Sequence, residues 1–273
     1  MMPRRPLRSH GFTLVEVLVA MTLTGIVVAG TLKALTAQKK FYARQARILE
    51  ARHAMRASAT ILSSEFREAS ASGGDLYAIA SDSVALRSTV GFAIVCDVSA
   101  GGGSISLAYV SGHFRLEAAD SVLVFVENSP ADGDDTWRAL QVLSISTTGP
   151  SCDSGAAPDR VVLVTGNLSG IWVGAPLRLF RPYVFGLFEM NGRWWLGRRN
   201  RGAGPDYVPV AGPLAPPGDL GLQLTYYRWN GTVTANPSQV VRVDIDIRAP
   251  TFRSLTDPAY KDLSTSSYLR NDE

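Results

Sequence analysis

The chain has 273 residues, 46% of them hydrophobic, with 25 Gly and 15 Pro, a composition that favours a loop-rich, β-leaning body over a helical bundle. Its formal charge of +3 comes from three arginines in the first 11 residues, Arg4, Arg5 and Arg8, because the remainder carries 24 basic and 24 acidic side chains. The body is therefore formally neutral, which argues against a basic groove for nucleic acid.

The basic leader is followed by an almost unbroken apolar run, residues 12–30, which contains a single acid, Glu16. At about 1.5 Å per residue a helix over this run would span roughly 28 Å, close to the thickness of a bilayer's hydrocarbon core. The three arginines are expected to stay in the cytoplasm while the rest is translocated. A secretory signal carries its small-residue cleavage site after the apolar core, whereas here Gly11 precedes it.

Helical character continues beyond the apolar run. Residues 31–70 contain no Pro or Gly, and their apolar side chains recur at helical spacing, with Arg and Lys on the other face. The apolar stripe comprises Leu32, Leu35, Phe41 or Tyr42, Ile48 or Leu49, Met55, Ile61 or Leu62, and Phe66. Gly73-Gly74 then ends the pattern. We expect one helix over residues 12–72, with 12–30 in a membrane or filament core and 31–72 amphipathic.

The stretch Gly11-Phe12-Thr13-Leu14-Val15-Glu16 resembles the processing site of type IV prepilins and type II secretion pseudopilins. The resemblance implies that prepilin peptidase removes residues 1–11 by cutting between Gly11 and Phe12, and that the new Phe12 amine is methylated. It also implies an ion pair between Glu16 and the Phe12 amine of a neighbouring subunit, which sets the register of filament assembly. A charged residue at the centre of a membrane helix costs about 2.5–3.5 kcal/mol, so a partner is expected. The alternative is a solvated or protonated Glu16 near the membrane interface.

Residues 73–273 are expected to form a β-rich head. The runs that favour strands are 83–88, 92–97, 104–109, 121–127, 137–145, 160–165, 177–181, 183–190, 193–198, 222–228 and 240–248. In "VRVDIDIR", apolar and charged residues alternate, which predicts a strand with one buried face. Asn191-Gly192 predicts a type I′ hairpin turn. The stretches 201–213 and 215–219 are expected to be loops, and the polar tail from Thr256 is expected to be partly flexible.

A long amphipathic helix and one-sided sheets each need a cover, so we expect an α+β lollipop in which the second half of the helix packs on antiparallel sheet. This is the type IV pilin-like fold that the N-terminal resemblance also implies. Several stretches of the head, among them "DSVLVFVENSPADGDDTWRALQVLSI", "DLGLQLTYY", "VVRVDIDIRA" and "SSYLRN", resemble large minor pilins of the PilW-like kind. They resemble the J-type minor pseudopilin of type II secretion less closely.

The two cysteines, Cys96 and Cys152, lie 56 positions apart and belong to no CxxC or Cys/His cluster. If the body is exported, a disulfide between them is the natural interpretation, and it would stabilise the fold by roughly 2–4 kcal/mol. The alternative is a pair of buried free thiols.

Two further clusters have both a functional and a structural interpretation. The turn containing Asp132, Asp134 and Asp135 could bind calcium but lacks the glutamate of an EF-hand, so a solvated turn without a cofactor is favoured. An aromatic-basic cluster could stack on single-stranded DNA or on a glycan, although core packing of the aromatics with solvated arginines is favoured. The members of the aromatic-basic cluster are Trp194, Trp195, Arg198 and Arg199, with Arg201 beside them.

We therefore expect a minor pilin that acts in assembly, in a tip or initiation complex, and not in catalysis. Its expected partners are other pilins, prepilin peptidase and the inner membrane, with nucleic acid disfavoured. The protein would reside in the bacterial inner membrane, with its body in the periplasm, and then in an extracellular pilus or a periplasmic pseudopilus. The alternatives are a type II secretion pseudopilin and a membrane-anchored adhesin or ligand-binding module.

Overall fold

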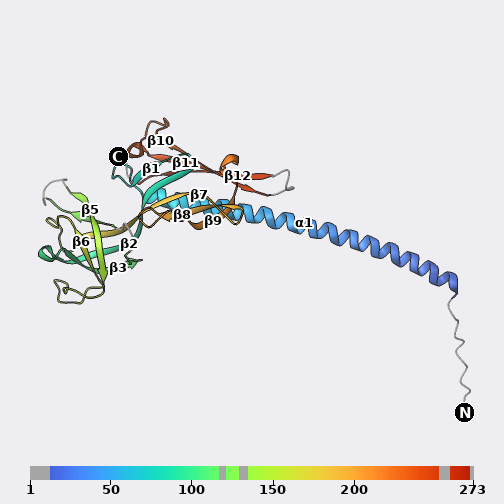
Figure 1. Cartoon of the computed structure of the whole chain (residues 1–273), viewed down its shortest axis with the longest axis horizontal. Coiled ribbons are helices and arrows are strands. Elements are labelled where there is room, and N and C mark those ends of the chain that lie inside the picture. The colour runs from blue at the N-terminus through green and yellow to red at the C-terminus, as the bar shows by residue number, and fades with distance from the viewer. Residues whose placement is uncertain (1–12, 117–120, 129–134, 252–258, 271–273) are drawn as a thin grey trace, which may run out of the picture. The chain divides into compact units, whose positions relative to one another are not determined.

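The computed structural model describes residues 13–116, 121–128, 135–251 and 259–270. These residues form one long helix, α1 (Leu14–Glu68), twelve strands in two antiparallel sheets, and three short 3-10 turns (Figure 1). The chain divides into two compact units, Met1–Leu49 and Glu50–Glu273, so α1 begins in the first unit and ends in the second. The predicted α+β class, a long N-terminal helix followed by antiparallel sheet, is confirmed.

The strands of the larger sheet are β1 (Leu76–Ile79), β2 (Ser83–Ser99), β3 (Ser104–Gly112), β4 (Ser121–Val126), β5 (Thr136–Ser146), β6 (Arg160–Thr165), β7 (Pro176–Met190), β8 (Arg193–Asn200) and β9 (Val208–Leu214). Those of the smaller sheet are β10 (Leu222–Tyr227), β11 (Arg242–Pro250) and β12 (Tyr260–Tyr268). The 3-10 turns are η1 (Ala100–Gly102), η2 (Pro217–Asp219) and η3 (Pro237–Gln239).

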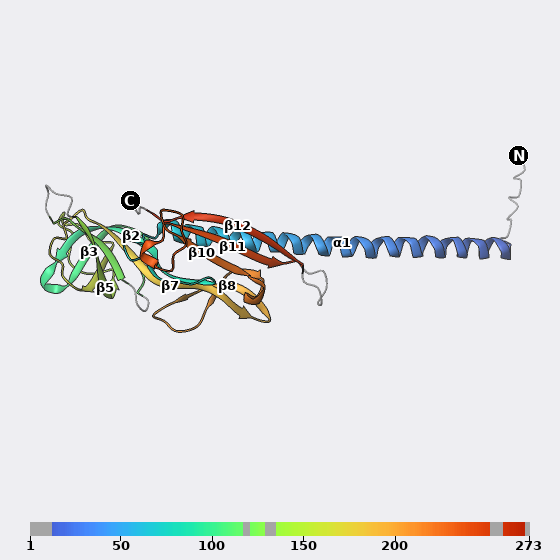
Figure 2. The same cartoon turned by 90° about the horizontal axis from the view of Figure 1, so that it is seen from above.

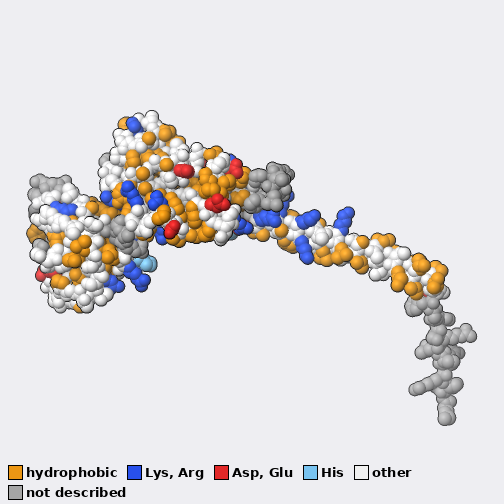
Figure 3. All heavy atoms as spheres, viewed as in Figure 1, with side chains coloured by type: hydrophobic (Ala, Val, Ile, Leu, Met, Phe, Trp, Pro, Cys, Tyr) orange, Lys and Arg blue, Asp and Glu red, His pale blue; other side chains and the backbone are white. Residues whose placement is uncertain are grey.

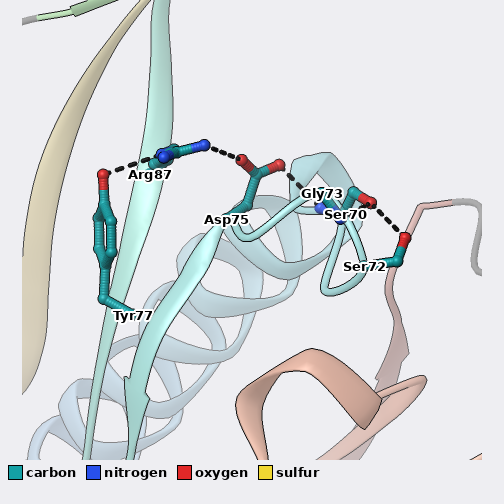
Figure 4. Close-up of polar contacts among 6 residues, drawn as sticks. All are labelled: Ser70, Ser72, Gly73, Asp75, Tyr77 and Arg87. Atoms are coloured by element: carbon teal, nitrogen blue, oxygen red, sulfur yellow. Dashed lines mark hydrogen bonds and ion pairs between the residues drawn. The ribbon is translucent and has the colours of Figure 1, made fainter. Parts of the chain in front are cut away.

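The end of α1 and the turn after it lead the chain into β1. Gly74 adopts a positive φ of 75°, a backbone conformation that favours glycine. The Asp75 carboxylate accepts a hydrogen bond from the Ser70 N–H at 2.9 Å, and the Asp75 N–H donates to the Ser70 carbonyl at 3.0 Å (Figure 4). These bonds give partners to the N–H and the carbonyl of Ser70, which lies just beyond the end of the helix.

The last part of α1 is buried in a core that takes side chains from both sheets. Its buried face comprises Ala51, Ala54, Met55, Ser58, Ala59, Leu62, Ser63 and Phe66. Leu62 packs in one core with Phe185 of β7 and Ile245 of β11. The Phe66 and Tyr226 rings meet edge to face, with centroids 6.5 Å apart. Figure 2 shows this part of α1 running along the β10–β12 sheet.

The predicted apolar stripe is only partly a core face. From Ala51 onward the apolar face of α1 is buried, whereas the earlier members of the stripe are exposed, namely Leu32, Leu35, Phe41, Tyr42 and Leu49.

Six strands of the larger sheet close into a barrel. The sheet order is β1-β2-β3-β6-β5-β4-β7-β8-β9, and β2 also pairs with β7, which completes a ring of β2, β3, β6, β5, β4 and β7. The interior is a second core of mostly aliphatic side chains, including the fully buried Ile105, Leu107 and Leu177. Closure leaves these six strands without a free edge where the ring is complete.

The two longest strands, β2 with 17 residues and β7 with 15, contribute to both cores. The sequence predicted a break in each, near Gly91 and at Pro182, and both breaks are wrong. Gly91 is a point of close approach, since a Cβ there would lie 2.4 Å from the Phe114 ring. Pro182, which lacks an N–H, lies after the β4 pairing ends at Phe180 and before the β8 pairing begins at Tyr183.

In the smaller sheet, β11 alternates as predicted, with Val243, Ile245, Ile247 and Ala249 buried. The prediction of a partly flexible polar tail is wrong for β12, which pairs with β11 from Arg242↔Tyr268 to Pro250↔Tyr260. The polar side chains of β12 have partners that a single sequence does not reveal. Ser266 donates to Asp244 at 2.7 Å, and Ser267 donates to the Ser63 carbonyl of α1 at 3.1 Å.

The β7–β8 hairpin confirms the predicted turn, because Asn191 and Gly192 both have positive φ values, 54° and 71°, as a type I′ turn requires. The prediction of a loop over residues 201–213 is wrong in its second half, where β9 pairs with β8. Since β9 is an edge strand of the sheet, Pro209 and Pro213 are tolerated there.

Candidate functional site

The first part of α1 exposes apolar side chains all round. Leu14, Met21, Ile26 and Val27 each leave most of their surface uncovered. Figure 3 shows hydrophobic side chains along the start of the described helix and Lys and Arg side chains further along. Within the described residues, α1 is the one helix whose length and composition would allow it to cross a membrane. Such a surface is suited to lipid or to other apolar helices and not to water.

Two threonine hydroxyls of this segment are bonded to carbonyls of their own helix. Thr22 donates its hydroxyl to the Val19 carbonyl at 2.9 Å, and Thr31 donates to the Val27 carbonyl at 2.8 Å. Back-bonding of this kind removes the cost of placing a free hydroxyl in hydrocarbon. Glu16 differs from these threonines because it is the one ionisable side chain within residues 12–30.

Glu16 and Thr13 form a capping box at the start of α1. The Thr13 N–H and hydroxyl donate to Oε2 of Glu16 at 3.2 Å and 3.3 Å, and the Glu16 N–H donates to the Thr13 hydroxyl at 3.3 Å. This reciprocal arrangement satisfies N–H groups that a helix start leaves without partners. The role of Thr13 was missed by the sequence analysis, although the spacing Thr-x-x-Glu before an apolar run is its signature.

The capping box uses one carboxylate oxygen of Glu16. Both bonds from Thr13 go to Oε2, and Oε1 accepts no hydrogen bond from the residues that the structure describes. A carboxylate has about four lone-pair sites. Glu16 can therefore accept the bonds from Thr13 and pair with a cation at the same time. The predicted cleavage position itself, Gly11–Phe12, lies outside the described residues.

Further along the first unit, α1 carries cations without acids. Residues 17–49 contain no Asp or Glu, and their five cations are Lys33, Lys39, Lys40, Arg44 and Arg47, all exposed. Because the apolar run ends at Gly30, the chemistry of the helix changes from apolar to basic within one turn.

The predicted disulfide is present and lies in the barrel. Cys96 of β2 is joined to Cys152 in the connection between β5 and β6. Backbone bonds hold the connection beside the strand: the Asp153 N–H donates to the Cys96 carbonyl at 3.0 Å, and the Cys152 N–H donates to the Ala156 carbonyl at 2.8 Å. The disulfide therefore anchors a long loop on the closed ring.

The predicted aromatic-basic cluster does not form one patch. Trp194 and Trp195 are neighbours on β8, so their side chains project to opposite faces of the sheet, and both are half-buried. The guanidinium of Arg198 stacks 4.3 Å from the Tyr183 ring centroid, and that of Arg199 lies 5.5 Å from the ring of Tyr207. The two arginines line a cleft of about 620 Å³ that the tryptophans do not line. Binding of DNA or glycan by this cluster stays a prediction.

Of the predicted calcium residues, Asp132 and Asp134 lie outside the described part of the chain, and Asp135 is exposed. Among the residues described, no group of three or more His, Cys, Asp or Glu side chains is placed to hold a metal ion.

Residues 6–32 match the family described as the prokaryotic N-terminal methylation motif. No curated protein and no solved structure matches the chain. The matched segment includes the Gly11–Phe12 junction, Thr13, Glu16 and the apolar start of α1. It supports a type IV pilin or pseudopilin class with a structural role, processed by prepilin peptidase and anchored in a membrane, whereas the head lies outside the match.

Proposed function

We propose that the chain is a minor pilin of a type IV pilus, cut between Gly11 and Phe12 and assembled through the first part of α1. The observation that carries this proposal is the methylation motif over residues 6–32, which coincides with a helix start whose apolar side chains are exposed. Before assembly, residues 12–30 hold the protein in the inner membrane with its head in the periplasm. After assembly, the same residues pack against the apolar segments of neighbouring subunits.

Glu16 couples processing to assembly. Cleavage creates a positive amine at Phe12, next to the capping threonine. A neighbouring subunit brings its own Phe12 amine to the free Oε1 of Glu16, while Oε2 stays bonded to Thr13. The ion pair forms in surroundings of low dielectric, where an uncompensated carboxylate is costly, so subunits in the wrong axial register are disfavoured.

The size and architecture of the head support a position at the tip or in an initiation complex. Residues 50–273 combine a helix-and-sheet body with a closed six-stranded barrel. A head of this size would crowd its neighbours along a thin filament, whereas a tip subunit has neighbours on one side only. The resemblance of the head to PilW-like minor pilins favours the same assignment. A J-type pseudopilin of type II secretion would share the processing and the helix, and the experiment below distinguishes the two.

The test uses a tagged chain in its native host. We expect mass spectrometry of the parent to find Phe12 as the methylated N-terminus, and Gly11→Val to retain the leader. Glu16→Val should be processed but be at least tenfold depleted from sheared pili, since breaking a buried ion pair costs about 3–5 kcal/mol.

The matched control is Thr22→Val, which also removes a polar group from this segment. Unlike the Glu16 carboxylate, the Thr22 hydroxyl is bonded within its own helix and is not expected to contact a neighbouring subunit. Equal amounts of Glu16→Val and Thr22→Val in the pili would contradict the assembly role. Recovery of the parent chain with secretion pseudopilins, and not with pili, would replace the minor-pilin assignment by a pseudopilin.

A further inference from the structure

A cleft of about 550 Å³ lies in the larger unit, between the turn after α1 and the outside of the barrel. Its lining includes Glu68, Ser70 and Asp75 from the end of α1 and the turn after it. Trp137 of β5 and Arg178 of β7 line it from the barrel strands. This volume is within the range of about 300–1,000 Å³ that is usual for small-molecule sites. We call it the Arg178 cleft.

Three guanidinium groups and two carboxylates line the Arg178 cleft, and one pair is already matched. Arg87 donates to the Tyr77 hydroxyl at 2.9 Å and to Asp75 at 3.4 Å, as Figure 4 shows. The guanidinium also lies 4.9 Å from the centroid of the Phe180 ring. Arg87 is thus fixed in position, and its charge is largely balanced by Asp75.

The positive charges of the other two guanidinium groups, those of Arg178 and Arg270, are not balanced by a bonded carboxylate from the described part of the chain. Arg178 is half-buried and stacks 5.0 Å from the centroid of the Trp137 ring. Neither guanidinium makes a hydrogen bond or ion pair with any residue that the structure describes. Burial, and then the positive charge of Arg270, lower the pKa of Arg178. A partly buried cation without a hydrogen-bonded partner is costly, and an incoming anion would remove part of that cost.

The remaining groups of the cleft indicate which other chemical groups a bound anion would have. Glu68 and Asp75 would repel a polyanion such as nucleic acid, but they can accept hydrogen bonds from hydroxyl groups. The hydroxyls of Thr89 and Thr136 add groups that both donate and accept. Trp137, 38% exposed, offers an apolar edge beside the guanidinium. Together these groups suit a ligand with one negative group on a hydroxyl-rich body.

From this geometry we infer that the Arg178 cleft binds a small acidic saccharide. Arg178 and Arg270 hold the carboxylate, for which the planar guanidinium fork is a good match. Glu68, Thr89 and Thr136 accept and donate hydrogen bonds at the sugar hydroxyls. This inference does not depend on the minor-pilin assignment, because the cleft is built entirely from residues outside the methylation motif.

The test is titration of the purified full-length chain, in nonionic detergent micelles, followed by calorimetry and ligand-observed NMR. The probes are glucuronate and N-acetylneuraminate, with glucose as the neutral match, inorganic phosphate as a bare anion, and a short Glu-containing peptide as a different anionic class. We expect at least one sugar acid to bind more tightly than glucose, phosphate and the peptide. Arg178→Gln should weaken that binding by about 10- to 100-fold, the loss usual for a charged hydrogen-bond partner.

Arg160→Gln is the matched control, since Arg160 is a barrel arginine that does not line the cleft. Arg270→Gln, at an exposed position, serves as the second variant if Arg178→Gln lowers the melting temperature. The proposal is overturned if neither sugar acid binds, if Arg160→Gln weakens binding as much as the cleft variants do, or if phosphate or the peptide binds as well as the sugar acid.

Discussion

Two carboxylates on α1, Glu16 and Glu65, occupy different surroundings. Glu16 is exposed at the helix start and bonded to Thr13, whereas Glu65 is half-buried and accepts a hydrogen bond from the Ser88 hydroxyl of β2. Glu16 could be singled out from the sequence because an acid in an apolar run is conspicuous there. Glu65 could not be singled out, because neighbouring acids and arginines surround it in the sequence and only the packing of β2 against α1 buries it.

Burial is the main cause that raises the pKa of Glu65, with a smaller contribution from Glu68 and opposing contributions from Ser88 and Arg198. The folded state therefore holds a proton at a pH where the unfolded chain has released it. The contribution of Glu65 to the free energy of unfolding is fully present at or below pH 4.5, the pKa of the group in the unfolded chain. It is lost as the pH rises through the higher pKa of the folded state. We expect Glu65→Gln, which keeps an acceptor for Ser88, to raise the free energy of unfolding at pH 7.

The measurement is chemical denaturation of parent and variant from pH 4 to pH 8. The gain from Glu65→Gln should grow with pH. Glu189→Gln, at an exposed position, is the comparison variant. A gain from Glu65→Gln that is independent of pH would show that the carboxylate is not the cause.

At the scale of elements, β2 and β7 connect the two cores of the head. Each strand has one part in the core around α1 and another in the barrel. The predicted breaks were wrong because Gly and Pro are ordinary signals for a strand end, whereas here they mark a close approach at Gly91 and an interval between partners at Pro182. The disulfide adds a covalent link on the barrel side only.

Replacing both cysteines, Cys96→Ser with Cys152→Ser, should lower the free energy of unfolding by about 2–4 kcal/mol, because the unfolded chain regains the freedom of the closed loop. The loss should be local. Hydrogen exchange should become faster in β2, β5 and β6, while β10–β12 keep the protection of the parent protein. Uniformly faster exchange across both sheets would contradict the assignment of the disulfide to barrel stability.

At the scale of the whole molecule, the two units differ in whether their apolar side chains are buried or exposed. The unit from Glu50 onward buries the apolar face of its part of α1 and contains both cores, whereas the described residues before it expose theirs. A chain of this kind needs a second environment, lipid or other helices, for the first unit only. This division fits the proposed function, in which the apolar segment exchanges lipid for neighbouring subunits.

A chain that begins at Glu50 should consequently be soluble and monomeric without detergent, with the melting temperature that the head has in the full-length protein. A chain that begins at Thr60 is the matched control, because it loses Ala51, Ala54, Met55 and Ala59 from the core. We expect this shorter chain to be less stable by at least about 2 kcal/mol, the usual cost of removing one large core side chain. Size-exclusion chromatography and thermal denaturation measure both results. Aggregation of the longer chain would show that the first unit is needed to fold the head.

The sequence by itself determined the helix, its apolar start, the N-terminal methylation motif, the hairpin turn at Asn191-Gly192 and the alternation of β11. All of these depend on residues within a few positions of one another, through the periods of the helix and the pleat. The tertiary structure decided the closure of the barrel, the pairing of β12 and the Arg178 cleft. In each of these, segments far apart in the chain meet, as Ala93 meets Leu177, and the free energy of such contacts depends on what is buried between the segments. Polar stretches such as β12 carry no local sign of that burial, because their partners, Asp244 and the Ser63 carbonyl, lie elsewhere in the chain.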